Sequence, residues 1–292
     1  MSPTILITGA AGHVGRQVAA LLAQQGHSLR LMGRQPERIA PLATATAVHG
    51  DYANPASLDA AFAGVQTAFV VSGYAEPGER AKLHRNAFEA AARAGVGHVV
   101  YLSFQGASPD SRFPMSRDHY QSEQYLQATG VPYTAVRDNL YLDLLPEMFD
   151  AQGIVRGPAA EGTTAFVARD DAARVAATLL ASPPSGSGRL DVTGPEALTL
   201  AEAAQRLAVL TGCPLRYEAE TSAAGRAWRS QLGAPAWEVD TWVGSYEAIA
   251  AGELSTVSNI VLAVTQQFPQ TLETYFAAKP HLLDVLRRSK AG

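Results

Sequence analysis

The sequence has little of what metal-binding or disulfide-stabilised proteins need. Its 292 residues contain one cysteine, Cys213, which excludes an internal disulfide and the paired thiols of a structural zinc site. The seven histidines show no metal-ligand spacing such as H-E-x-x-H, and no G-x-S-x-G nucleophile elbow occurs. We therefore expect neither a metal site nor a hydrolase.

Long apolar runs and strong positive charge are also missing. The apolar stretches fall well below the roughly 20 residues of a membrane-spanning helix, and no export signal precedes the first apolar strand. The formal net charge is −4, and the only basic cluster is Arg287 to Lys290. This charge balance argues against a nucleic-acid partner. We expect a cytoplasmic monomer or homodimer without a membrane partner.

What is present is an alternation of short β-branched runs with longer segments of helical period, up to about residue 137. This pattern predicts an α/β fold with a parallel sheet wound with helices on both faces. Asn54 is expected to cap a helix that Pro55 opens. We expect strands over residues 5–8, 28–33, 45–50, 67–73, 98–103 and 133–138, with helices over about 78–94 and 116–127.

Beyond Asn139 the regular alternation fails. Residues 166–182 predict a helix entered through Asp170 or Asp171, and residues 188–194 predict a further strand that could rejoin the sheet. Thr199 is the expected cap of the next helix, with Glu202 at the capping-box position. The last hundred residues, which hold all three tryptophans, are expected to be largely helical.

The stretch "ILITGAAGHVG" carries the clearest functional signal. Gly9, Gly12 and Gly15 follow a strand and open a helix, which is the context of a dinucleotide-binding turn. Unpaired N–H groups at the helix start would face the pyrophosphate. The alternative is a tight turn in an ordinary α/β protein. A P-loop fits worse, because no Gly-Lys-Ser or Gly-Lys-Thr follows.

The end of the second strand discriminates between the two nicotinamide cofactors. An NAD site usually places an acidic residue there to accept hydrogen bonds from the ribose hydroxyls. In this sequence Gly33 and Arg34 occupy that place, with Arg38 one helical turn further on. Because an arginine attracts a 2′-phosphate, the sequence predicts NADP(H) as the cofactor.

These motifs together resemble a known family. With "TGAAGHVG", "GR" after the second strand, "GDY" after the third and "VVSG" ending the fourth, the chain resembles the short-chain dehydrogenase/reductase superfamily. The later "HYQSEQYL", "GVPYTAVRDNLYLDLL" and "FPQTLETYF" are similar to its NmrA-like, atypical branch, which includes NADPH-dependent quinone oxidoreductases and triphenylmethane reductases. The similarity extends over nearly the whole chain.

The resemblance implies a Rossmann-type domain over residues 1–152 and a mainly substrate-binding region over 153–292, with about 170–194 packing back on the sheet. It implies an NADP(H) site with Asp51 and Tyr52 near the adenine and with Ser72 and Gly73 near the nicotinamide ribose. Either Asp138 or Asn139 would contact the nicotinamide half. The remaining cofactor residues would be Thr8, Gly9, Ala10, Gly12, His13, Val14, Gly15 and Arg34.

The candidate catalytic residues lie on the expected helix over 116–127 and at the strand before it. Reductases of the superfamily use a Tyr-x-x-x-Lys pair, in which the lysine lowers the tyrosine pKa. Here Tyr120 is in register, but Gln124 replaces the lysine and supplies no charge. Ser103 and His119 are alternative proton donors. Tyr74, Phe104 and Tyr141 are candidates for the substrate pocket, or else rim and core residues.

An unassisted tyrosine is a poor acid for reducing a simple ketone near neutral pH. Quinones and other conjugated acceptors need positioning more than an acid. The sequence therefore predicts an NADPH-dependent reductase of a quinone-like or other conjugated small molecule. The alternative is a non-catalytic NADP(H) sensor that binds a regulatory protein partner, for which Gln124 is the best support.

Overall fold

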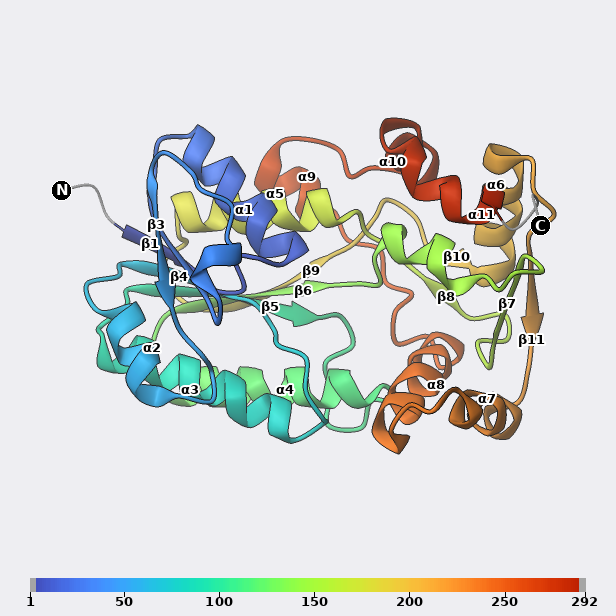
Figure 1. The fold of residues 1–292 in the computed structure, drawn as a ribbon, viewed down its shortest axis with the longest axis horizontal. Coiled ribbons are helices and arrows are strands. Elements are labelled where there is room, and N and C mark those ends of the chain that lie inside the picture. Colours follow the sequence, from blue (N-terminus) through green and yellow to red (C-terminus); the bar gives the residue numbers. More distant parts are fainter. Residues whose placement is uncertain (1–3, 289–292) are drawn as a thin grey trace.

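The computed structural model describes residues 4–288, and a parallel seven-stranded sheet forms the centre of the fold (Figure 1). The strand order is β3-β2-β1-β4-β5-β6-β9. The crossover from β3 to β4 passes back over β1, so the carboxyl ends of β1 and β4 flank the switch point where α/β proteins bind ligands. The strands are β1 (Thr4–Ile7), β2 (Ser28–Gly33), β3 (Ala45–His49), β4 (Thr67–Val70), β5 (His98–Phe104), β6 (Tyr133–Asp138) and β9 (Gly188–Val192).

Helices cover both faces of the sheet, which explains its nearly continuous apolar strands. In Figure 1, α1 (His13–Gln24), α5 (Arg169–Ala181) and α9 (Ile260–Thr265) lie on one side. On the other side lie α2 (Pro55–Phe62), α3 (Glu79–Arg93) and α4 (Pro114–Ala128). Each side has its own buried apolar cluster. The predicted α/β Rossmann-type architecture is confirmed.

Two predicted helix starts are confirmed and one is wrong. The Asn54 side chain accepts a hydrogen bond from the Ser57 N–H at the start of α2. Thr199 and Glu202 form a capping box at α6 (Leu200–Thr211). However, α5 begins at Arg169, so Asp170 and Asp171 lie in its first turn and do not cap it. The buried Asp171 carboxylate instead accepts hydrogen bonds from Gln270.

The chain leaves the sheet after β6 and builds a second, mostly helical part around another apolar cluster (Figure 1). No helix within residues 4–288 is long and apolar enough to cross a membrane. The elements of this part are η2 (Leu142–Met148), β7 (Ile154–Gly157), β8 (Thr163–Thr164), β10 (Leu198–Thr199), α6, β11 (Arg216–Ala219), α7 (Ser222–Arg229), η3 (Ser230–Leu232), α8 (Ala236–Ala250), α10 (Leu272–Ala278), η4 (Pro280–Leu283) and α11 (Asp284–Arg288).

Candidate functional site

The turn between β1 and α1 depends on glycine at two positions, Gly9 and Gly15. Gly9 has a left-handed backbone with φ of 58°. A Cβ added at Gly15 would lie 2.4 Å from the Gly9 carbonyl oxygen, so α1 packs against the turn at backbone distance. Gly12 is the N-cap and no side chain caps the helix. The first turn of α1 therefore presents its backbone N–H groups to a ligand.

A groove of about 260 Å³ begins at this turn and runs over the ends of β2 and β3. We call it the outer groove. Arg34, Asp51, Tyr52, Ser72 and Gly73 all line it, together with Gly9 and Gly33. Arg34 is exposed at the end of β2, at the position predicted to meet a 2′-phosphate.

Two predicted cofactor residues lie beneath the surface of this groove. Thr8 is fully buried, and its hydroxyl hydrogen-bonds to the Tyr52 hydroxyl at 2.6 Å and accepts from the Val71 N–H at 2.9 Å. Ala10 is also buried, and its N–H donates to the Met32 carbonyl. Neither residue is among those that line the groove, so the structure gives both a role in holding the turn.

A larger cavity of about 640 Å³ continues from the groove; we call it the central cavity. It shares Gly9, Ser72, Gly73 and Tyr74 with the groove. The predicted residues that line it are Gly9, Gly12, His13, Val14, Gly15, Ser72, Gly73, Tyr74, Phe104, His119, Asp138, Asn139 and Tyr141. The glycine turn thus joins two connected hollows, as an extended dinucleotide requires.

Asp138 stands at the end of β6, and its carboxylate accepts a hydrogen bond from the Tyr141 hydroxyl. Burial raises the pKa of Asp138 to about 7, although Tyr141, Arg169 and Arg80 each oppose this shift. Burial and the neighbouring Asp138 raise the pKa of Tyr141 well above its usual value. The two side chains therefore hold a proton that can be released near neutral pH inside the cavity.

Asn139 differs from its neighbour because all its side-chain bonds go to protein groups. Its amide nitrogen donates to Gln105 and to the Leu254 carbonyl, and its oxygen accepts from Leu140 and Thr164. Asn139 therefore ties the end of β6 to the C-terminal part. Of Asp138 and Asn139, it is Asp138 whose side chain can gain or lose a proton.

Arg80 is a buried cation that also lines the cavity. Its guanidinium donates to the Gly73 carbonyl at 2.7 Å and contacts His119 Nε2 at 2.8 Å. Within residues 4–288 it hydrogen-bonds but forms no ion pair. Its charge is consequently not cancelled by a paired carboxylate, and it makes the cavity favourable for an anion.

His119 is a neutral imidazole with both ring nitrogens engaged. Burial and then Arg80 lower its pKa well below the usual value. Because a guanidinium only donates, Nε2 must accept, and we assign the ring proton to Nδ1, which lies 3.0 Å from the Tyr101 hydroxyl. The ring therefore positions Arg80, and the predicted proton donation into the cavity finds no free N–H here.

Ser103, another predicted donor, is locked in a buried charge cluster. Its hydroxyl donates to Glu123 Oε1 at 2.7 Å. The Glu123 carboxylate also binds Arg137 at 2.7 Å and Arg189 at 2.6 Å. These residues come from β5, α4, β6 and β9, so the cluster holds the sheet to α4. Ser103 does not line the central cavity.

Tyr120 and Gln124 lie on α4 as expected, but they are half-buried and are not among the cavity residues. The face of α4 that is turned toward the sheet carries His119, Ser122 and Glu123. A shift of one position rotates a side chain by about 100° on a helix. The superfamily's tyrosine position is thus directed away from the cavity, while the preceding histidine faces it.

Sequence reasoning missed several residues of the cavity, chiefly Arg80, Arg169 and Leu144, and it allowed for a C-terminal tryptophan, which the structure identifies as Trp242. Arg80 follows the end of β4 by ten residues and lies in the first turn of α3. This position near the end of a central strand was the only feature of the sequence that could have indicated a place in the cavity. Arg169 ion-pairs with Asp143, and its guanidinium lies 4.8 Å from the centre of the Tyr141 ring.

Within the described part of the chain, no group of three or more His, Cys, Asp or Glu side chains could hold a metal.

Comparison with known proteins supports the predicted cofactor class and family. A family model described as NAD(P)H-binding matches residues 9–183. A (4-alkanoyl-5-oxo-2,5-dihydrofuran-3-yl)methyl phosphate reductase from Streptomyces griseus is 36% identical, covering 73% of this chain and 76% of its own. The NAD(P)H azoreductase of Xenophilus azovorans is 29% identical, covering 94% and 98%.

Solved structures show the same fold. The NADPH-dependent quinone oxidoreductase of Escherichia coli, complexed with NADPH, has a TM-score of 0.85 at 27% identity, over 94% of this chain and 99% of that chain. NmrA, a negative transcriptional regulator solved with NADP, has a TM-score of 0.74 at 17% identity, which shows the common fold alone.

Proposed function

The chain belongs to the NAD(P)H-binding family, and we propose that it is an NADPH-dependent reductase that transfers hydride to a neutral conjugated acceptor such as a quinone. The observation that carries this proposal is the content of the central cavity. A buried cation, Arg80, and a protonatable pair, Asp138 and Tyr141, face one space beside the glycine turn. The oxidoreductases among its relatives support the same class of reaction.

NADPH, when bound, would supply the hydride. Gly9, Gly12 and the first turn of α1 would hold its pyrophosphate, and Arg34 its 2′-phosphate. Addition of hydride to a quinone leaves an anionic ring oxygen. Arg80 would stabilise that charge in a site of low dielectric. Asp138, with a pKa near 7, would then protonate the oxygen directly or through Tyr141.

The same charges select among acceptors. A neutral quinone gains a negative charge during the reaction and is stabilised by Arg80, which has no carboxylate partner in the described part of the chain. A cationic dye instead brings a positive charge next to this guanidinium group, which raises the energy of the bound state. We therefore favour neutral acceptors over cationic dyes, although both accept hydride readily.

Steady-state assays with NADPH and a panel of quinones test the function directly. We expect turnover of neutral quinones and weaker turnover of a cationic triphenylmethane dye. Tight NADPH binding without turnover of any acceptor would overturn the proposal.

Cofactor preference is tested separately by Arg34→Glu. Reversal of the charge that meets the 2′-phosphate should raise the KM for NADPH about tenfold and leave the KM for NADH unchanged or lower. Arg38→Glu, one turn further on, is the matched charge reversal and should have a smaller effect. Equal KM changes for both cofactors would contradict the role of Arg34.

The second candidate is an NADP(H) sensor without catalysis, supported by Gln124 at the usual lysine position. A sensor has no need of an open space beside the nicotinamide. The central cavity of about 640 Å³, with Phe104 and Trp242 in its lining, therefore favours the reductase. Binding of a protein partner that changes with the NADPH/NADP⁺ ratio, in a chain that reduces no acceptor, would reverse this preference.

A further inference from the structure

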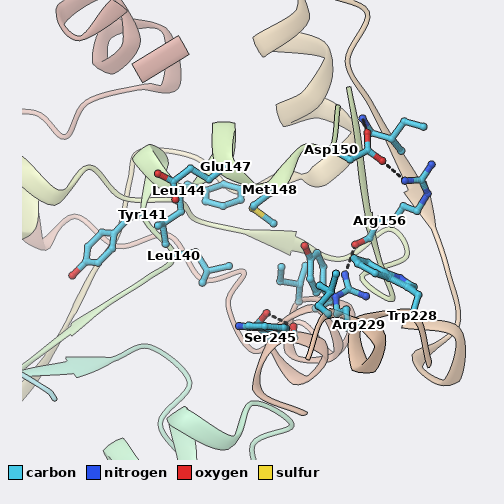
Figure 2. Close-up of a pocket in the computed structure, with 16 residues that line it drawn as sticks. Leu140, Tyr141, Leu144, Glu147, Met148, Asp150, Arg156, Trp228, Arg229 and Ser245 are labelled. Carbon is cyan, nitrogen blue, oxygen red and sulfur yellow. Dashed lines mark hydrogen bonds and ion pairs between the residues drawn. The ribbon is translucent and has the colours of Figure 1, made fainter. Parts of the chain in front are cut away.

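A third hollow, which we call the distal cavity, lies in the C-terminal part and has a volume of about 470 Å³. Figure 2 shows the 140–148 segment on one side of it, facing Trp228, Arg229 and Ser245. It shares Leu140, Tyr141, Leu144 and Trp242 with the central cavity. The two hollows therefore adjoin each other at these four side chains.

The walls of the distal cavity are largely apolar and aromatic. Phe166, Trp228 and Tyr246 contribute rings, and Leu232 and Met148 contribute aliphatic surface. Trp228 is 39% exposed and Leu232 is 64% exposed, which is unusual for large apolar side chains on one small surface. A ligand that covered them would remove this apolar area from water.

The two arginines of the distal cavity are already paired, so they offer no binding site for an anion. Arg229 is bound to Glu220 at 2.6 Å and to the Arg156 carbonyl at 2.7 Å, and it stacks on Trp228. Arg156 pairs with Asp150 and Glu218 (Figure 2 shows the Asp150 pair). Glu147, exposed at the edge, adds a further negative charge.

We propose that the distal cavity binds an uncharged apolar substituent of the acceptor whose reactive ring lies in the central cavity. This inference rests on the proposed function and deepens it. The substrate class becomes a conjugated ring that carries a hydrocarbon or aromatic tail without an anionic group. A tail ending in a carboxylate would lose its hydration, meet Glu147 and find no free cation.

Three matched probes test this inference: 2,3-dimethoxy-5-methyl-1,4-benzoquinone, the same quinone with an n-decyl chain, and the same chain ending in a carboxylate. With NADPH and wild-type protein, we expect the decyl quinone to have a KM about tenfold below that of the chain-free quinone. The carboxylate form should lose most of this gain. Equal KM values for the decyl and carboxylate forms would overturn the inference.

Two variants locate the effect. Leu232→Asp places a charge on an exposed wall residue and should raise the KM for the decyl quinone about tenfold, with unchanged kcat and no effect on the chain-free quinone. Val209→Asp is the matched control, because Val209 is 80% exposed on α6 and lines none of the three hollows. If Leu232→Asp kept the lower KM for the decyl quinone relative to the chain-free quinone, the inference would be overturned.

Failure of the proposed function is distinguishable from failure of this inference. If the wild type reduces neither quinone, the proposed reductase function fails. Binding of the decyl hydroquinone, followed by quenching of tryptophan fluorescence, then tests the distal cavity by itself. Saturable quenching that Leu232→Asp weakens and Val209→Asp does not would support the cavity. Quenching that is equal in both variants would overturn it.

Discussion

Glu123 and Asp138 are both buried carboxylates at the same end of the sheet, but their surroundings differ. Glu123 is bound by Arg137, Arg189 and the Ser103 hydroxyl, so its charge is compensated at every oxygen. Asp138 is bound by the Tyr141 hydroxyl and forms no ion pair within residues 4–288. Burial therefore raises the pKa of Asp138 to about 7. A compensated carboxylate serves the fold, whereas an uncompensated one can exchange a proton.

The largest expected effect concerns the stability of Asp138→Asn. The folded-state pKa of about 7 lies above the unfolded value of 3.8, so the wild type loses stability as pH rises from about 4 to 7. An asparagine has no charge to bury. The free energy of unfolding of Asp138→Asn minus that of the wild type should therefore grow by about 4 kcal/mol between pH 4 and pH 8. Urea unfolding of the cofactor-free protein at these two pH values measures this, and a pH-independent difference would contradict it.

Glu123→Gln should change the free energy of unfolding in the opposite direction. It leaves Arg137 and the partly exposed Arg189 without their carboxylate, which should lower the free energy of unfolding by about 3 kcal/mol at pH 7. The matched control is Asp59→Asn, which breaks the exposed pair with Arg93 and should cost below about 1 kcal/mol. Comparable losses in the two variants would remove the distinction between this buried cluster and a surface pair.

The third prediction concerns the rate of Asp138→Asn. If Asp138 donates the proton, quinone reduction at pH 6 should fall about 100-fold, which corresponds to about 2.7 kcal/mol. The wild-type rate should decline above about pH 7, where Asp138 ionises, and this decline should be absent in the variant. Asp171→Asn is the control, because Asp171 is buried in α5 but lines none of the three hollows. An unchanged pH profile in Asp138→Asn would refute the assignment.

The smallest effect is expected for Tyr141→Phe. Loss of the hydroxyl removes a hydrogen bond that favours the ionised carboxylate, so the pKa of Asp138 should rise further. The decline of the rate should move to higher pH, with a loss of about fivefold at the optimum. Recording kcat from pH 5 to 9 measures the shift, and movement toward lower pH would show that Tyr141 does not stabilise the carboxylate.

Much of the fold could be predicted from the sequence because its signals are local. The glycine spacing of residues 9, 12 and 15 predicted a turn in which Gly9 and Gly15 leave no room for another residue. Asn54 and Thr199 predicted helix starts because their hydrogen bonds close within three residues. The cap at Asp170 or Asp171 failed for the converse reason, since Asp171 bonds to Gln270, 99 residues away.

The sequence by itself determined the order of strands and helices, the glycine turn and the arginine after β2, all of which depend on neighbours a few residues apart. Only the tertiary structure decided which face of α4 meets the cavity. It turns His119 and Glu123 inward and leaves Tyr120 and Gln124 outside the lining, although both pairs have the same spacing. It also places Arg80, on α3, and Asp138, at the end of β6, beside the same cavity. Contacts between distant elements fix how each helix is rotated and how deeply each charged group is buried.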